Sequence, residues 1–90
     1  MGERKLKNPG YHLVEIPKGK LGEVSKIEEE LAELQDARTQ KSSIMELVEL
    51  SDLFGAIEHY LRKQHPGTTM DDLATMSRIT QRAFKSGRRK

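Results

Sequence analysis

Two pairs of acidic residues, separated by 15 residues, have a spacing that could support chemistry. Glu30 and Glu33 are three positions apart, and so are Glu49 and Asp52. On a helix, side chains three positions apart lie on neighbouring parts of one face. If the chain reverses between the pairs, two antiparallel helices bring all four carboxylates together. Four carboxylates repel one another unless a cation lies between them, and such hard oxygen ligands favour Mg²⁺ or Mn²⁺.

The same acids have a simpler interpretation as solvated residues on helix surfaces. Glutamate is a good helix former, and acidic residues are common on exposed helix faces. This interpretation suits the first pair better than the second. Glu49 and Asp52 fall within a segment that is apolar on almost all sides, where an uncompensated charge is costly.

The order Glu-Glu-x-x-Glu at 29–33, followed by Glu-x-x-Asp at 49–52, resembles the signature of the MazG-like all-α nucleoside triphosphate pyrophosphohydrolases. The surrounding segments GEVSKIEEELAELQDA, IMELVELSDLFGAIEHYL and MSRITQRAFKSGRR are similar to those of small, phage-type members. This resemblance extends over roughly residues 11–89. It implies Mg²⁺-dependent cleavage of an NTP or dNTP to the monophosphate and pyrophosphate, with Mn²⁺ as the alternative ion.

The resemblance also implies roles for individual acids. The residues matching the family's metal ligands are Glu30, Glu33, Glu49 and Asp52. Glu29 matches the extra acid of the motif, as an outer ligand or as the base that orients water, and Glu33 joins it as a catalytic residue.

Basic side chains and one histidine are candidates for holding the substrate's triphosphate. We name Arg38, Lys41, His59, Arg82 and Lys85. Each of the cations alone is more often a solvated surface charge. His59 lies two helical turns beyond Asp52, where it either reaches the substrate or edges the core. His12 is expected to be exposed and without a role.

Composition limits the remaining function classes. Ninety residues make one domain, and a core this small is marginal without partners. The absence of cysteine excludes disulfides and thiolate chemistry. Without a signal peptide or an apolar run long enough to span a membrane, we expect a cytoplasmic protein with no membrane contact. Charge is uneven: residues 21–60 carry −7, whereas 1–20 carry +3 and 61–90 carry +6.

Apolar periodicity predicts an all-α chain: a short bundle of three main helices, completed by oligomerisation. We expect an extended N-terminal arm at 1–19, a MazG-like helical domain at 20–86 and a basic tail at 87–90. Within the domain, helices are predicted at about 21–38, 44–63 and 70–84, the second with a capping box at 43–46. That helix is apolar on several sides, which a monomer hardly covers, so we predict a homodimer or homotetramer.

Two other functions remain open. The segment from 69 to 87 superficially resembles the second half of a helix-turn-helix, which would suit a small nucleic-acid-binding protein. However, it lacks a Gly or Pro at the turn and its apolar spacing is continuous, so we predict one helix and no specific nucleic-acid partner. A non-catalytic helical interaction protein is the other alternative. Neither alternative explains the paired acids at 49–52.

Overall fold

The computed structural model describes residues 12–85, with side chains for 12–82, as three α-helices joined by short turns. Helix α1 spans Val24–Thr39, α2 spans Ser43–Gln64 and α3 spans Met70–Lys85. The predicted all-α class is confirmed, and the described residues contain no strand. The first 11 residues of the predicted arm, the predicted tail at 87–90 and the side chain of Lys85 lie outside the described residues.

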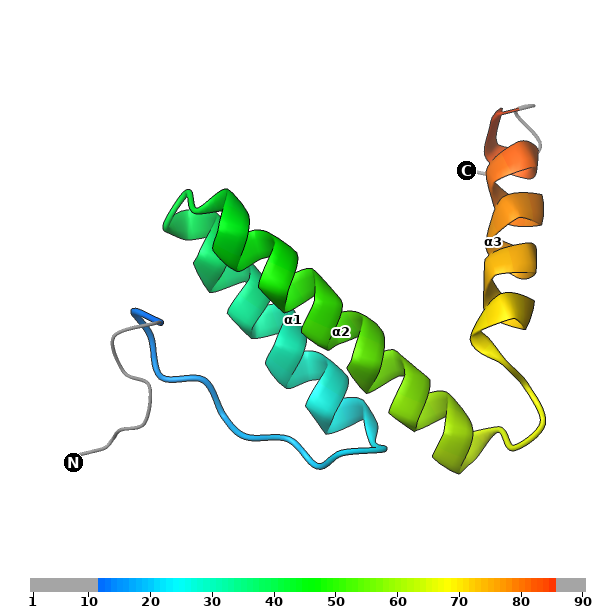
Figure 1. Ribbon diagram of the computed structural model, residues 1–90, viewed down its shortest axis with the longest axis horizontal. Helices are drawn as coiled ribbons and strands as arrows, with labels where there is room; N and C mark the ends of the chain where they lie inside the picture. Colours follow the sequence, from blue (N-terminus) through cyan, green and yellow to red (C-terminus); the bar gives the residue numbers. More distant parts are fainter. Residues whose placement is uncertain (1–11, 86–90) are drawn as a thin grey trace.

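Helices α1 and α2 form an antiparallel pair (Figure 1). The turn between them is centred on Lys41, which adopts a left-handed backbone conformation with φ of 59°. The amide N–H groups of Lys41 and Ser42 donate to the carbonyls of Arg38 and Ala37, the pattern of a Schellman motif that ends α1. The chain therefore does reverse between the two acid pairs, in the polar segment 39–43.

Two helix starts differ from the sequence-based expectation. Gly22 has φ of 89° and lies in a turn, so α1 begins at Val24 rather than near residue 21. The N-cap of α2 is Ser42, whose hydroxyl accepts from the Met45 amide at 3.2 Å. The predicted N-cap at Ser43 is thus displaced by one residue to Ser42. The capping box predicted at 43–46 does not form, because the residue three positions after Ser42 is Met45, whose side chain cannot return the hydrogen bond.

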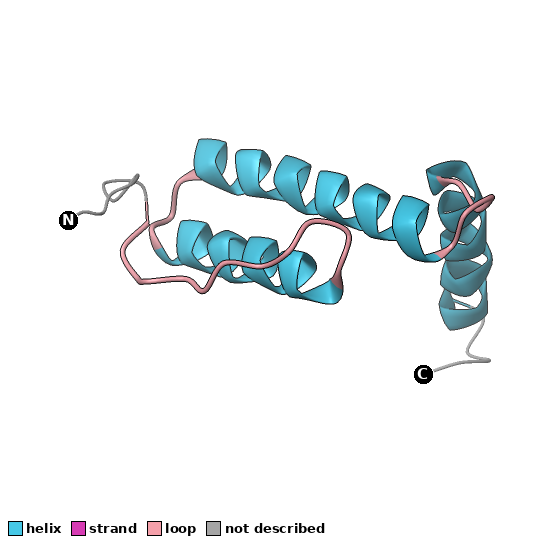
Figure 2. Ribbon diagram, turned by 90° about the horizontal axis from the view of Figure 1, so that it is seen from below, coloured by secondary structure: helices cyan, strands magenta, loops and turns pink. Residues whose placement is uncertain are grey.

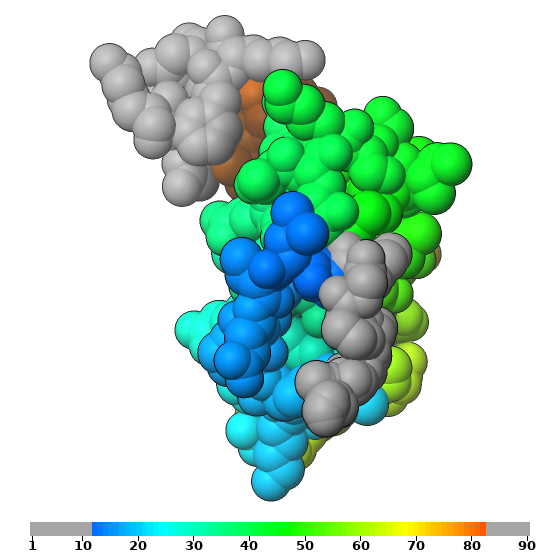
Figure 3. All heavy atoms as spheres, turned by 90° about the vertical axis from the view of Figure 1, so that its left-hand side faces the viewer, coloured from blue at the N-terminus to red at the C-terminus, as the bar shows by residue number. Residues whose placement is uncertain are grey.

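The described part of the arm, residues 12–19, runs alongside the helix pair without regular secondary structure (Figure 2). Figure 3 shows these residues, in blue, lying against the surface of the pair. Their polar contacts are mainly with α1, although His12 also lies 3.3 Å from Glu49 of α2. The Leu13 amide donates to Asp36 Oδ2 at 3.1 Å, and the Gly19 amide donates to Glu29 Oε1 at 2.8 Å. The arm is therefore tied at both ends to carboxylates of one helix.

Helix α3 is one continuous helix, as predicted, but it stands apart from the α1–α2 pair (Figure 1). Its start is well defined, because Thr69 and Asp72 exchange backbone and side-chain hydrogen bonds of 2.9 and 3.1 Å in a capping box. Met76 and Ile79, three positions apart on this helix, are 59% and 55% exposed in the single chain, because no other described helix covers them.

The interior of the helix pair holds few apolar side chains. Among the described residues, the buried hydrophobic residues are Ala37, Ala56 and Leu61. The buried charged residues are Glu29, Glu30, Asp36 and Glu49. Since buried charges persist only when they are paired or bind a cation, this interior has the character of a site rather than of a core. Among the described helices, none combines the length and apolar composition that crossing a membrane requires.

Candidate metal centre

The four acids singled out by their spacing meet between α1 and α2. Glu30, Glu33, Glu49 and Asp52 each offer a carboxylate oxygen, and the four oxygens lie within 4.8 Å of one another. The turn explains this convergence. Glu33 and Glu49 lie eight residues before and after Lys41, and Glu30 and Asp52 lie eleven residues before and after it. Equal distances from the turn place each α1 acid opposite its α2 counterpart in an antiparallel pair.

Two oxygens of this group of four lack any hydrogen-bond partner in the described part of the chain. Glu30 Oε1 and Glu49 Oε1 are both fully shielded from solvent. Glu49 is only 1% exposed, although it is a charged residue. A buried carboxylate oxygen without a donor costs free energy that a bound cation would recover. The donor set therefore fits a divalent metal ion with oxygen ligands.

The electrostatics of the four carboxylates also favour a bound cation. Burial, together with the neighbouring carboxylates of Glu30 and Glu49, raises the pKa of Glu33 to about 8. Burial and the charge of Glu30 also raise the pKa of Asp52, an effect that Lys26 partly offsets. In both acids the negative charge is disfavoured, so the group gains from any positive charge placed among its oxygens.

Lys26 supplies one such charge at the edge of the group. Its ammonium lies 3.1 Å from both Glu29 Oε1 and Glu30 Oε2. Burial by itself would lower the pKa of Lys26, but its contacts with these two carboxylates raise it overall. Lys26 therefore remains charged and neutralises part of this end of the group.

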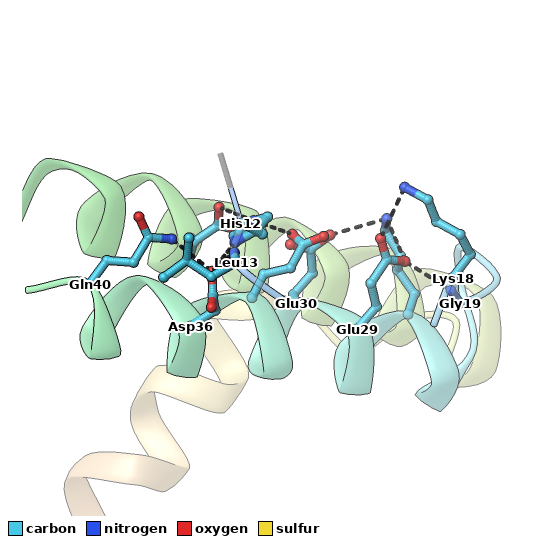
Figure 4. Close-up of polar contacts among 11 residues, drawn as sticks. His12, Leu13, Lys18, Gly19, Glu29, Glu30, Asp36 and Gln40 are labelled. Carbon is cyan, nitrogen blue, oxygen red and sulfur yellow. Dashed lines mark hydrogen bonds and ion pairs between the residues drawn. The ribbon is translucent and has the colours of Figure 1, made fainter. Parts of the chain in front are cut away.

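Glu29 lies outside the group of four and holds the arm. Besides the Gly19 amide, its carboxylate contacts Lys26 and, at 3.7 Å, the exposed Lys18 (Figure 4). Burial opposes the charge of Glu29, but these donors and cations lower its pKa below the ordinary value. Its catalytic role stays a prediction, and its structural contacts connect the arm to α1.

His12 is not the exposed bystander that the sequence suggested. Its side chain is only 10% exposed and its ring faces three acids. Nδ1 lies 2.8 Å from Asp36 Oδ2, while Nε2 lies 3.3 Å from Glu49 Oε2 and 3.9 Å from Glu33 Oε1. The expectation failed because His12 precedes α1 by a dozen residues in a segment with no helical periodicity, so nothing local indicated where it would fold back.

Asp36 is a second residue that the sequence reasoning missed. Its Oδ2 accepts hydrogen bonds from His12, from the Leu13 amide and from Gln40 Nε2 (Figure 4). Burial opposes its charge, but these three donors lower the pKa of Asp36 below the usual value. The available signal was its position three residues after Glu33, which places it one turn further along the same face of α1.

The described side chains proposed to hold the triphosphate are all exposed. Arg38 and Lys41 are exposed near the α1–α2 turn, where Arg38 pairs with Glu46 at 3.2 Å. His59 is exposed, and its Nδ1 lies 2.9 Å from the carbonyl oxygen of Gly55. Arg82 is exposed on α3, away from the helix pair. Their role as phosphate contacts stays a prediction.

Comparisons of the chain with protein-family models, with characterised proteins and with solved structures found no match. The chemistry of the site must therefore be argued from its own geometry. Four converging carboxylates, two of them with unpartnered buried oxygens, can bind one or more divalent cations. A metal centre at the surface of a helix pair can in turn bind phosphate oxygens and activate water.

Proposed function

We propose that this protein is a Mg²⁺-dependent nucleoside triphosphate pyrophosphohydrolase, which cleaves an NTP or dNTP to the monophosphate and pyrophosphate. The observation that carries the proposal is the group of four carboxylates with its two unpartnered buried oxygens. The motif and segments that resemble MazG-like enzymes support the reaction type, because the same four residues match that family's ligand positions.

The acids would bind metal ions and position the attacking water. Glu30, Glu33, Glu49 and Asp52 would hold Mg²⁺, with Mn²⁺ as the alternative ion. When bound, Mg²⁺ supplies charge neutralisation for the triphosphate and lowers the pKa of water. By the resemblance, Glu29 and Glu33 would also take part in positioning the attacking water.

A second copy of the chain would complete the substrate site. In one chain the described basic residues proposed for the triphosphate are exposed, and α3 and much of α2 expose apolar side chains. We therefore propose a homodimer or homotetramer in which α2 is buried and basic side chains of a neighbouring copy reach the nucleotide. The alternative, a nucleic-acid-binding protein, would use exposed Arg78 and Arg82 on α3.

Activity measured on matched variants tests the enzyme hypothesis. Glu33→Gln removes one negative charge from the group at constant size, and it should lower turnover by about two to four orders of magnitude. Glu28→Gln, at an exposed position on the same helix, should change turnover less than about threefold, under about 1 kcal/mol. Pyrophosphate release would be measured across all NTPs and dNTPs with Mg²⁺.

Three results would reject the proposal. Equal losses for the two variants would mean that α1 carries no specific site. Orthophosphate with a nucleoside diphosphate would mean cleavage at the terminal bond instead. Tight, sequence-selective DNA binding at physiological salt, unaffected by Glu33→Gln, would favour the nucleic-acid alternative.

A further inference from the structure

The two most deeply buried carboxylates of the group of four share one arrangement. In Glu30 and in Glu49, Oε2 contacts a nitrogen-bearing side chain, while Oε1 has no hydrogen-bond partner among the described residues. The nitrogen beside Glu30 is the Lys26 ammonium, 3.1 Å from Oε2. The nitrogen beside Glu49 is Nε2 of His12, 3.3 Å from Oε2. In each acid one oxygen is thus held from outside the group, and the other is left for a cation.

The His12 ring is itself held from its other side. Its Nδ1 lies 2.8 Å from Asp36 Oδ2, and the side chains of these two residues are only 10% and 3% exposed. The same oxygen of Asp36 accepts from the amide of Leu13, the next residue of the arm, at 3.1 Å (Figure 4). Both the ring and the adjoining backbone are therefore anchored to one buried acid of α1. A ring fixed in this way has little freedom to turn away from Glu49.

The contact between His12 and Glu49 restrains the acid whichever of the two groups carries the proton between them. A protonated ring attracts the carboxylate as an ion pair, and a protonated Glu49 offers its O–H to a neutral ring nitrogen. In both forms Oε2 stays beside the ring, so the carboxylate keeps one orientation and Oε1 remains the unpartnered oxygen. Outer partners that orient metal-binding carboxylates in this way matter, because their loss typically costs about 10–100-fold in metal affinity.

We propose that His12 is a positioning residue of the metal centre: anchored to α1 through Asp36, it holds Glu49 Oε2 and leaves Oε1 to bind the divalent cation. Its role parallels that of Lys26 beside Glu30, but it comes from a segment that precedes both helices. A centre built from acids of two helices thus depends on the arm for the orientation of one ligand. The inference rests on the metal centre of the proposed function, but not on the cleavage of a nucleotide.

Calorimetric titration of the full chain with Mg²⁺ tests this role. His12→Ala should weaken Mg²⁺ binding at least about tenfold. His12→Gln should bind within about threefold of the wild type, because the glutamine amide carries a donor where histidine carries Nε2. His12→Asn, whose amide reaches only as far as Nδ1, should bind as weakly as His12→Ala. Lys18→Ala is the matched control, because Lys18 is an exposed residue of the arm that contacts Glu29 instead, and it should leave the affinity unchanged.

The two amide variants separate positioning of Glu49 from simple attachment of the arm. If His12 only attached the arm to α1, His12→Asn, which can still contact Asp36, would bind Mg²⁺ at least as well as His12→Gln, and that result would overturn the inference. Wild-type affinity in His12→Ala would overturn it as well. Circular dichroism of each variant guards against misfolding, and the comparison of the two amides holds even if His12→Ala does not fold.

The outcomes also separate this inference from the proposed function. A wild-type protein whose Mg²⁺ affinity depends on His12, but which releases no pyrophosphate from any nucleotide, would reject the proposed function and support the inference. An active enzyme in which His12→Ala binds Mg²⁺ like the wild type would do the reverse. A wild-type protein that binds no Mg²⁺ would overturn both.

Discussion

Glu49 is the most deeply buried of the acids that the structure describes. It is a glutamate at 1% exposure, with one oxygen beside His12 and the other without a partner. Its neighbours Glu30 and Glu33 add further negative charge. In the native state such a residue is stabilised by whatever cation reaches it, and the free energy of unfolding should therefore depend on the cation supplied.

Divalent metal should raise the melting temperature, and Glu49→Gln should abolish this response. Binding to the native state alone adds about 2.7 kcal/mol to the unfolding free energy at a metal concentration 100 times Kd. With one carboxylate replaced by an amide, repulsion falls and the metal loses a ligand. Differential scanning fluorimetry with and without Mg²⁺ measures the effect. Glu58→Gln, which alters only an exposed pair with Arg62, should keep the full response.

The raised pKa of Glu33 predicts a pH dependence of the metal-free protein. Native Glu33 keeps its proton up to about pH 8, whereas the unfolded chain releases it near 4.5. Between these values the native state binds more protons, so its stability is largest at the acidic end and falls as pH rises towards 8. Urea unfolding at pH 5.5 and 8.5 would measure this loss. A Glu33→Gln variant with the same loss would show that another group titrates.

At the scale of elements, the arm and α1 act as one unit. Gly19 lies so close to the backbone of Ser25 that a Cβ at this position would collide with the Ser25 carbonyl. The same glycine donates its amide to Glu29. The arm can therefore approach α1 only because residue 19 has no side chain, and that approach positions His12, seven residues earlier.

Gly19→Ala should release the arm while leaving the helices intact. The collision involves backbone, which cannot move aside as a flexible side chain could, and overpacking of this kind typically costs about 1–3 kcal/mol. Trypsin cleavage after Lys18 and Lys20 should become faster, with unchanged helix content by circular dichroism. Gly55→Ala is the control, since a Cβ there meets nothing within 4 Å in the single chain. Equal cleavage rates in the two variants would contradict this account.

The helices and the group of four acids could be predicted because they depend on local regularities. Glu30 and Glu33 lie at helical spacing, as do Glu49 and Asp52, and the polar segment around Lys41 is the natural place for a reversal. The contribution of His12 could not be predicted. It arises from a long-range contact with Asp36, 24 residues away, which no periodicity encodes.

The position of α3 relative to the other helices could not be predicted, for a different reason. The spacing of Met76 and Ile79 correctly indicates an apolar helix face, but periodicity cannot say which surface covers it. In the single chain that face is exposed. The sequence thus identifies the face, while its partner depends on the assembly.

At the scale of the whole molecule, the single chain is extended. Its radius of gyration is 16.0 Å, compared with about 12 Å for a compact 90-residue domain. The α2 side chains Leu47, Leu50 and Phe54 recur at helical spacing and are 66%, 47% and 57% exposed. Both features are what a subunit shows when its remaining contacts come from other copies.

We expect a stable homo-oligomer that an added charge on α2 disrupts. Light scattering at micromolar concentration should give the mass of a dimer or tetramer. Leu47→Glu should shift this mass to that of the monomer, because burying the apolar side chains of α2 would then bury a charge as well. Gln35→Glu introduces the same charge at an exposed polar position of α1 and should leave the mass unchanged. A monomeric wild-type protein would refute this expectation.

The carboxylate-rich interior of the helix pair also has a calorimetric consequence. Unfolding that exposes apolar surface raises the heat capacity, whereas exposing polar groups lowers it. Among the described residues, the buried ones include four acids and only three hydrophobic residues. The heat-capacity change on unfolding of a single chain should therefore be below the usual value of about 12–15 cal/mol/K per residue. Its stability curve would be unusually flat with temperature, and the ordinary curvature would return only with the apolar surface buried between subunits.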